Sequence, residues 1–324
     1  MSQKMKLILL AGLIILLLGA CAVANSANEE RVILYSNADD EAVQAMEEAL
    51  DGAGYEGKYT IQSFGTSELG GKIMAEGKEI EADLITMASY FLESAQQQNT
   101  MFSEVEPIAN SLDDLGNYQL PILGNAGSIF VNTKALEEQG LSAPESIKDL
   151  AKPEYAGHFS FPNLFDSSTG WLLVQGVLAT YGEQEGQEIL ASLKENAGPH
   201  LESSGSGPIK KVKTGEVAVG FGLRNQAVQA KNEGLPIEVI DPAEGNFTLT
   251  ESLSVVEKED NALAIEMARV LAEKARPALL EEYPVVLYEG ETLAEENEAN
   301  FTQWESTLTV ELLEQHQAIF EAAK

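Results

Sequence analysis

Three short stretches rich in serine, threonine and glycine are the parts of this chain best suited to binding chemistry. They are Gly65-Thr66-Ser67, Ser167-Ser168-Thr169 and Ser204-Gly205-Ser206, and each stands where a helix should begin. The first N–H groups of a helix are unpaired and partially positive, and small hydroxyl side chains let an oxyanion approach them. Arg224 follows an apolar run at 216–222, and its planar guanidinium can grip two oxygens at once. These residues predict a site for a tetrahedral oxyanion such as a phosphonate or phosphate group.

Other polar residues at predicted strand ends complete this site, and some of them have a second interpretation. Asp166 is a carboxylate suited to an amine, and Trp171 can either floor a cleft or pack in the core. For Arg224, the alternative is a surface ion pair, with the neighbouring glycine and serine residues forming a solvated loop. The predicted ligand-binding residues are Ser36, Asn37, Gly65, Thr66, Ser67, Ser89, Ser128, Asp166, Ser167, Ser168, Thr169, Trp171, Ser204, Gly205, Ser206 and Arg224.

Strands and helices alternate in the part of the chain that must position these residues. We predict strands at 31–36, 58–64 and 81–87, with helices at 41–50 and 68–77 between them. This alternation indicates βαβ units and a parallel sheet. The carboxyl ends of such strands meet at one edge, where ligands bind. The polar turns that follow the strands are therefore expected to converge.

The N-terminus has the pattern of an export signal. Lys4 and Lys6 precede an apolar run at 7–18, which is shorter than the roughly 20 residues of a membrane span. The run ends in Leu18-Gly19-Ala20-Cys21, which resembles the lipobox of bacterial lipoproteins. We predict a signal peptide at 1–20, a lipidated Cys21 and a tether at 21–30. The alternative is an ordinary secretory signal with a chance cysteine.

Composition excludes several classes of function. The chain has 52 acidic and 20 basic residues, a formal charge of −32, which disfavours nucleic acid as a partner. Cys21 is the single cysteine, so disulfides and cysteine-based metal sites are not expected. The three histidines are far apart in the sequence, and we find no nucleophile elbow and no metalloprotease motif. We therefore expect no catalytic residues, no cofactor and no resident metal.

Several motifs, in their order and spacing, resemble the extracellular solute-binding proteins of bacterial ABC importers. The resemblance covers most of residues 31–275 and is closest to the subgroup that binds ferric iron, thiamine, polyamines, phosphonates or sugar phosphates. The motifs that carry it are Tyr35-Ser36, Phe64-Gly65-Thr66-Ser67, Asn125-Ala126-Gly127-Ser128, Asn132-Thr133-Lys134, Pro162-Asn163 with Ser167-Ser168-Thr169-Gly170, and Gly205-Ser206-Gly207.

This resemblance implies an α/β fold of the type II periplasmic-binding class. Two lobes, each with a mainly parallel sheet, would be joined by a two-strand hinge and would enclose the ligand. We place lobe 1 at 31–126 and 246–324 and lobe 2 at 127–245; the glycines at 124–127 interrupt the pattern at the crossing. The implied partners are a small, anionic solute, the importer's permease and ATPase, and the membrane through Cys21. The protein is expected to be an extracytoplasmic monomer and not an enzyme.

We predict that the solute is a phosphonate or a phosphorylated small molecule, with ferric iron, thiamine or a polyamine as the alternatives. Iron-binding members of the family use two adjacent tyrosines where this chain has Arg224-Asn225, so ferric iron is disfavoured. Polyamine binding favours acids such as Asp39, Asp166 and Glu251, but Arg224 argues against a dication. An aminophosphonate such as 2-aminoethylphosphonate suits both kinds of residue. A membrane-anchored hydrolase or an adhesin-like lipoprotein is the alternative of another class.

Overall fold

The structure is a computed structural model that describes residues 31–294, 299, 301–302, 304 and 307–324. The predicted signal peptide, the tether and Cys21 lie outside the described residues. Within the described part of the chain, no helix combines the length and the apolar character that crossing a membrane requires.

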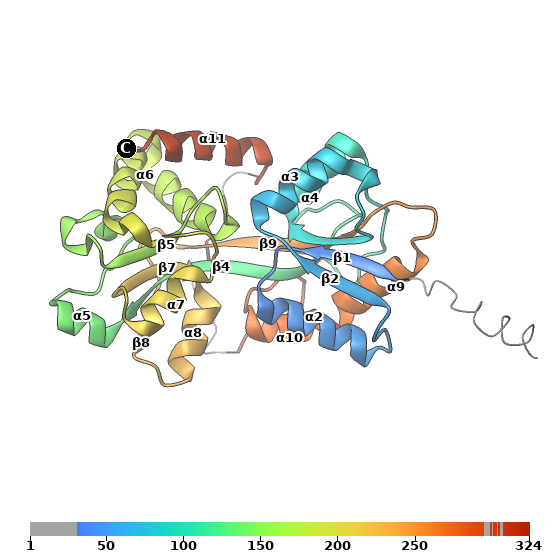
Figure 1. Ribbon diagram of the computed structural model, residues 1–324, viewed down its shortest axis with the longest axis horizontal. Helices are drawn as coiled ribbons and strands as arrows, with labels where there is room; N and C mark the ends of the chain where they lie inside the picture. Colours follow the sequence, from blue (N-terminus) through green and yellow to red (C-terminus); the bar gives the residue numbers. More distant parts are fainter. Residues whose placement is uncertain (1–30, 295–298, 300, 303, 305–306) are drawn as a thin grey trace, which may run out of the picture.

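Two α/β lobes lie side by side and are joined by long strands (Figure 1). In the first lobe, β1 pairs in parallel with β2 on one side and β3 on the other, as the alternating pattern predicts. Its elements are β1 (Val32–Ser36), α2 (Asp40–Gly52), β2 (Tyr59–Ser63), α3 (Thr66–Glu76), β3 (Leu84–Ala88), α4 (Ser89–Asn99), α9 (Ala262–Val270) and α10 (Arg276–Glu282).

The second lobe repeats the pattern, with β5 parallel to both β6 and β7. Its longest helix, α6, is interrupted at Gly182, where φ is 72°, a value that glycine adopts without strain. The elements are α5 (Thr133–Gln139), β5 (Phe159–Pro162), α6 (Ser168–Ala197), β6 (Leu201–Glu202), α7 (Gly207–Thr214), β7 (Val219–Leu223), α8 (Arg224–Asn232) and β8 (Ile237–Ile240), with short 3-10 turns between them.

Two long strands, β4 (Leu120–Asn132) and β9 (Asn246–Val255), form the hinge. They pair with each other in antiparallel fashion, and their outer parts join β3 in the first lobe and β7 and β8 in the second. The strand order is therefore β2-β1-β3-β9-β4-β7-β5-β6. The predicted two-lobed α/β fold is confirmed, and among the described strands each antiparallel pair includes β4 or β9.

The glycines of β4 do not interrupt the strand, contrary to the expectation from the sequence. Instead they allow side chains from other elements to pack directly on its backbone. A Cβ atom at Gly124 would lie 2.5 Å from Cβ of Val285, and one at Gly127 would lie 2.7 Å from the ring of Phe221. The strand can therefore run unbroken from one lobe into the other.

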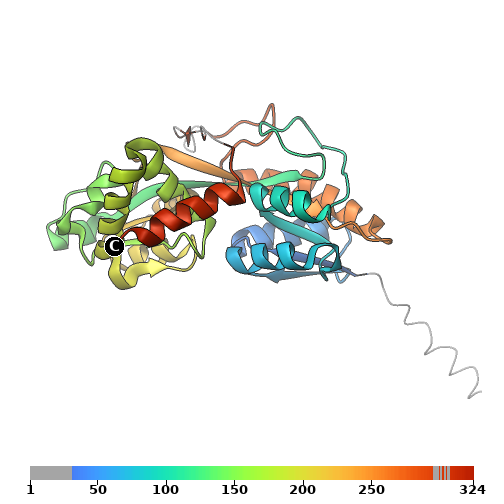
Figure 2. The ribbon, with the colours of Figure 1, turned by 90° about the horizontal axis from the view of Figure 1, so that it is seen from above.

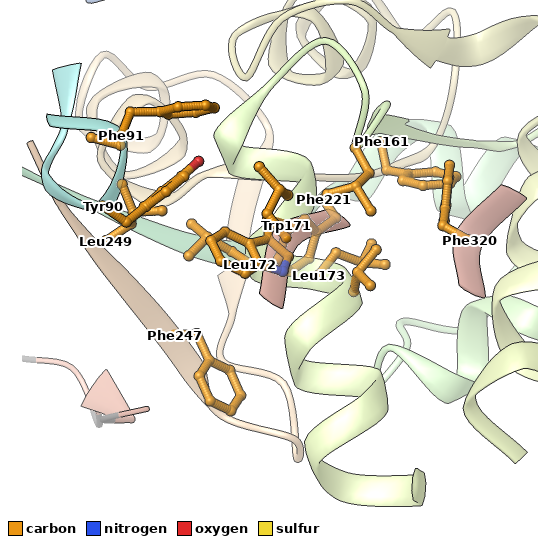
Figure 3. Close-up of a cluster of buried hydrophobic side chains, with 14 of the residues drawn as sticks. Tyr90, Phe91, Phe161, Trp171, Leu172, Leu173, Phe221, Phe247, Leu249 and Phe320 are labelled. Atoms are coloured by element: carbon orange, nitrogen blue, oxygen red, sulfur yellow. The ribbon is translucent and has the colours of Figure 1, made fainter. Parts of the chain in front are cut away.

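An aromatic cluster packs across the junction of the lobes (Figure 3). Trp171 of α6 is fully buried, and its ring lies edge-on to that of Tyr90 of α4, with centroids 4.9 Å apart. The prediction that Trp171 lines the ligand cleft is therefore wrong, and its alternative, core packing, is correct. Burial of the large indole ring in an apolar core is more favourable in free energy than its partial exposure in a polar cleft.

The C-terminal helix α11 (Val310–Ala322) lies along α6 of the second lobe (Figures 1 and 2). Nε1 of Trp171 donates a hydrogen bond to Nδ1 of His316 at 2.8 Å, and Lys194 donates to the carbonyls of Phe320 and Ala323. The assignment of all of 246–324 to lobe 1 is thus wrong for this helix. The sequence reveals the apolar stripe of α11, but not the surface that the stripe covers. The short strand β10 (Phe301–Thr302) pairs with β9.

Candidate functional site

A cavity of about 240 Å³ lies between the two lobes. It is close to the lower end of the volumes typical of small-ligand pockets, roughly 300–1,000 Å³. Its wall is built mainly from turns that follow strands and open helices, together with side chains of the two hinge strands. The lining residues are Asn37, Ala38, Asp39, Asp40, Phe64, Gly65, Thr66, Leu123, Asn125, Asp166, Ser167, Ser168, Thr169, Ser203, Ser204, Gly205, Ser206, Leu223 and Glu251.

Many of the residues predicted from the sequence line this cavity. They come together because the strands of each lobe present their carboxyl ends to the same space. Those that line it are Asn37, Gly65, Thr66, Asp166, Ser167, Ser168, Thr169, Ser204, Gly205 and Ser206. All three serine- and glycine-rich stretches are thus at one site, although they lie in different βα units of two lobes.

The turns that open the helices have local causes that the sequence contains. Ser167 is the N-cap of α6 and accepts a hydrogen bond from the N–H of Thr169 at 3.3 Å. Asp39 is the N-cap of α2 and accepts from the N–H of Ala42 at 3.4 Å. Position 205 accommodates only glycine, because a Cβ atom there would collide with the hydroxyl of Thr169. The cavity wall therefore consists of capped helix starts held close together.

Four predicted hydroxyl residues do not line the cavity, because their side chains bond to neighbouring elements. The hydroxyl of Ser36 accepts from Thr86 at 2.6 Å, and that of Ser128 donates to the carbonyl of Ile240 at 2.9 Å. Ser89 donates to the carbonyl of Thr250 at 3.1 Å. Ser67 of the first lobe donates to the carbonyl of Phe165 in the second, so it bridges the lobes.

Arg224 also lies outside the cavity, contrary to the prediction. Successive residues at the end of a strand point to opposite faces, and here Leu223 faces the cavity. Arg224 is 7% exposed, and its Nε donates to Oδ1 of Asp241 at 3.2 Å. It lines a separate space of about 10 Å³ beside Tyr283. The guanidinium is therefore engaged in a structural ion pair.

Carboxylates dominate the charge of the cavity wall. Asp39, Asp40, Asp166 and Glu251 line it, and no Lys or Arg is among the lining residues that the structure describes. Asp40 and Asp166 are exposed at the rim, whereas Glu251 is only 3% exposed. The sequence suggested Asp39 and Glu251 only as candidates for a polyamine site. The signal for Glu251 was that it is the one charged residue in the strand 246–255.

Asp39 and Glu251 occupy unusual electrostatic environments. Burial raises the pKa of Asp39, although the hydrogen bond from the hydroxyl of Tyr283 favours its charged form. Burial, and then the charge of Asp39, raise the pKa of Glu251 to about 8. Asp39 also accepts from Nε2 of Gln226 at 3.3 Å, across the gap between the lobes. Among the described residues, neither of these two carboxyl groups has a cationic partner.

The fold resembles solved structures of periplasmic binding proteins. A periplasmic thiamin binding protein is 15% identical and has a TM-score of 0.72, covering 90% of this chain and 95% of its own. The protein AfuA of Actinobacillus pleuropneumoniae, with fructose-6-phosphate bound, is 18% identical (TM-score 0.69; 80% and 84%). Iron-bound HitA of Pseudomonas aeruginosa is also 18% identical (TM-score 0.68; 90% and 99%). At these identities the likeness shows the fold alone.

Curated relatives share about a quarter of their aligned residues with this chain. An uncharacterized protein of Haemophilus influenzae is 25% identical over 244 residues, 71% of this chain and 69% of its own. The spermidine/putrescine-binding periplasmic protein of Escherichia coli is 25% identical over 189 residues, 53% of each chain. The match therefore spans about half the length of the spermidine/putrescine-binding relatives.

A family profile gives the broadest assignment. The profile described as "Bacterial extracellular solute-binding protein" matches residues 79–308, which include both hinge strands and all of the second lobe's elements from α5 to β8. The match covers more than half of the chain and agrees with the two-lobed fold and its central cavity. The chain belongs to the bacterial extracellular solute-binding protein family.

Proposed function

We propose that this protein is the solute-capturing component of an ABC importer, and that its cavity holds a small solute with at least one protonated amine. The observation that carries the proposal is the set of four carboxylates in the wall, with no Lys or Arg among the described lining residues. An ammonium group favours the ionised form of each of these carboxyl groups, whereas an added anion opposes it.

Of the two supports for a purely anionic solute, the helix starts line the cavity but Arg224 does not. That hypothesis depended on Arg224 as the cationic anchor, and Arg224 instead pairs with Asp241 outside the cavity. The formal charge of −32 adds an unfavourable field for any anion that approaches the cleft. The polyamine alternative, set aside on the sequence because of Arg224, therefore regains support, and the E. coli relative is a spermidine/putrescine-binding protein.

A zwitterion such as 2-aminoethylphosphonate is the second candidate. The hydroxyl and backbone donors at the starts of α6 and α7, around Ser168 and Ser206, suit an oxyanion. The carboxylates of the first lobe would then hold the amine at the other end. This solute satisfies both kinds of donor and acceptor, whereas a phosphate ester without an amine satisfies only one.

Calorimetry and thermal shift with a fixed panel of probes test this proposal. The panel is 1,4-diaminobutane, spermidine, 2-aminoethylphosphonate, fructose 6-phosphate, thiamine and ferric citrate. We expect amine-bearing probes to bind and to stabilise the protein, by about 2.7 kcal/mol at a hundredfold excess over Kd. Binding of fructose 6-phosphate or ferric iron, with no response to any amine, would contradict the proposal.

We further propose that the protein is anchored to the outer face of the cell membrane through a lipid on Cys21. The support is the sequence Leu18-Gly19-Ala20-Cys21 after a basic and apolar leader. One acyl chain anchors only marginally, so we expect several on the mature N-terminus. Mass spectrometry should detect lipidated Cys21, and Cys21→Ser should release the protein from the membrane fraction. An unmodified N-terminus beyond this residue would contradict the anchor.

A further inference from the structure

Two acceptor atoms that belong to cavity-lining residues have no hydrogen-bond partner among the residues that the structure describes. They are Oε2 of Glu251, on the hinge strand β9, and Oδ1 of Asn37, in the turn after β1. The two side chains are near enough for Asn37 to influence the ionisation of Glu251. Buried acceptors without donors are costly, and natural proteins rarely retain them without a reason. Each of these two atoms therefore lacks a hydrogen-bond donor.

The other contacts of Glu251 do not supply this donor. Its Oε1 accepts from Nδ2 of Asn125 at 2.9 Å, which leaves Oε2 unsatisfied. The titratable groups that face it are Asp39 at the start of α2, Tyr90 on α4 and Tyr283 after α10. None of these is a cation, and Asp39 adds negative charge. A proton is then the simplest occupant, in agreement with the raised pKa of about 8 for Glu251.

We propose that Glu251 and Asn37 form the ammonium subsite of the cavity, and that a solute amine enters it by displacing one proton from Glu251. The inference rests on the proposed function, namely that the cavity binds an amine. In this step the O–H bond of the Glu251 carboxyl group breaks, and the proton passes to the solvent. The carboxylate then accepts an N–H bond from the ammonium group, and the carbonyl of Asn37 accepts a second one. No oxidation or reduction takes place.

Proton displacement makes capture depend on pH in a defined direction. The free protein holds the Glu251 proton below about pH 8, and the complex gives it up because the ammonium favours the charged carboxylate. Affinity should therefore rise about tenfold for each pH unit from 6 to 7 and level off above about 8. A carboxylate that is already ionised in the free protein would give no such slope.

Calorimetry in two buffers measures the proton directly. Titration of the protein with 1,4-diaminobutane at pH 7, in phosphate and in Tris, gives two enthalpies, because the buffers take up protons with different heats. The number of protons released is the difference between the two binding enthalpies, divided by the difference between the ionisation enthalpies of the two buffers. We expect a value close to one. Tight binding with equal enthalpies in both buffers would overturn the inference while leaving the proposed function in place.

Glu251→Gln tests whether the proton comes from this residue. The glutamine side chain is isosteric with the neutral acid, so the variant should fold, release no proton and bind 1,4-diaminobutane at least about tenfold more weakly. Asp260→Asn, an exposed acid outside the cavity, is the matched control and should leave both the proton count and the affinity unchanged. Undiminished proton release in Glu251→Gln would overturn the assignment. If that variant fails to fold, the two-buffer measurement on the wild type still decides. Failure of every amine to bind would instead overturn both proposals.

Discussion

The two walls of the cavity differ in chemistry although they are built in the same way. The first lobe contributes carboxylates, with Asp39 and Asp40 at the start of α2 and Glu251 where β9 pairs with β3. The second lobe contributes mainly hydroxyl groups, from 167–169 and 203–206, with only Asp166 at its rim. Both walls are helix starts at the carboxyl ends of strands. The scaffold therefore fixes the position of the site, and the residues at each turn determine what each wall attracts.

This difference gives the cavity a direction. A positively charged end of a solute should point to the first lobe, and an end rich in oxygen should point to the hydroxyl groups of the second. Because both walls line one cavity, they can contact opposite ends of the same molecule. The hydrogen bond between Gln226 and Asp39 and the one between Ser67 and Phe165 already cross the gap. Because the two walls consist of different residues, substitutions can test each wall separately.

The largest effect is expected from Asp39→Asn. Asp39 is half-buried, and loss of a largely desolvated charge that faces an ammonium group costs about 2 kcal/mol or more, so affinity for 1,4-diaminobutane should fall about thirtyfold. Asparagine caps helices as well as aspartate does, so α2 should keep its N-cap. Calorimetry measures the affinity, with the exposed Asp260→Asn as the charge-matched control. Equal affinities for Asp39→Asn and wild type would mean that the carboxylate wall does not bind the solute.

A smaller and selective effect is expected on the hydroxyl wall. The double variant Ser204→Ala, Ser206→Ala removes two donors, each worth about 0.5–1.5 kcal/mol. Affinity for 2-aminoethylphosphonate should therefore fall about tenfold, whereas that for 1,4-diaminobutane should change little. Competition binding with both probes measures the ratio. An equal loss of affinity for both probes would show that the hydroxyl wall does not bind the oxyanion end selectively.

Arg224→Met should affect stability more than binding. The methionine keeps the apolar volume of the side chain but removes the ion pair with Asp241. Because Arg224 lies outside the cavity, affinity for either probe should change by less than about threefold, as is usual for residues that do not touch the ligand. Thermal unfolding and calorimetry on the same sample separate the two readouts. A loss of affinity above tenfold for 2-aminoethylphosphonate would restore Arg224 as an anion-binding residue.

The smallest effect concerns the pH dependence of the second lobe. Burial lowers the pKa of His316, whose Nδ1 accepts a hydrogen bond from Trp171. A depressed pKa means that this contribution to stability is present above the unfolded value of about 6.5 and is lost as pH falls below it. Between pH 7 and 5 the wild type should therefore lose more unfolding free energy than His316→Gln, which can accept the same bond without titrating. An equal loss of unfolding free energy between pH 7 and 5 in the two proteins would contradict this role of His316.

Local signals in the sequence predicted much of the fold. The strand–helix alternation of the first lobe agrees with the structure, since β1, β2 and β3 lie close to the predicted ranges at 31–36, 58–64 and 81–87. The helix starts predicted at 167–169 and before 41–50 are also found, with Ser167 and Asp39 as N-caps, because capping depends on a few neighbouring residues. The prediction from the glycines of β4 was wrong. A glycine in the sequence can mark either the end of a strand or a place where a side chain packs on its backbone, and here Val285 and Phe221 pack on β4.

The sequence by itself determined that polar, capped helix starts gather at the carboxyl ends of strands in a two-lobed protein. The helix starts and their positions follow from residue type, spacing and the geometry of parallel sheets, whereas the two lobes were implied by the resemblance to solute-binding proteins. Only the tertiary structure decided which side chains face the cavity. A shift of one residue along the chain turns a side chain to the other face of a strand, and this separates Arg224 from Leu223. The pairing of β3 with β9 brings Glu251 to the same wall as Asp39, more than 200 positions away, because contacts between distant strands depend on the whole fold.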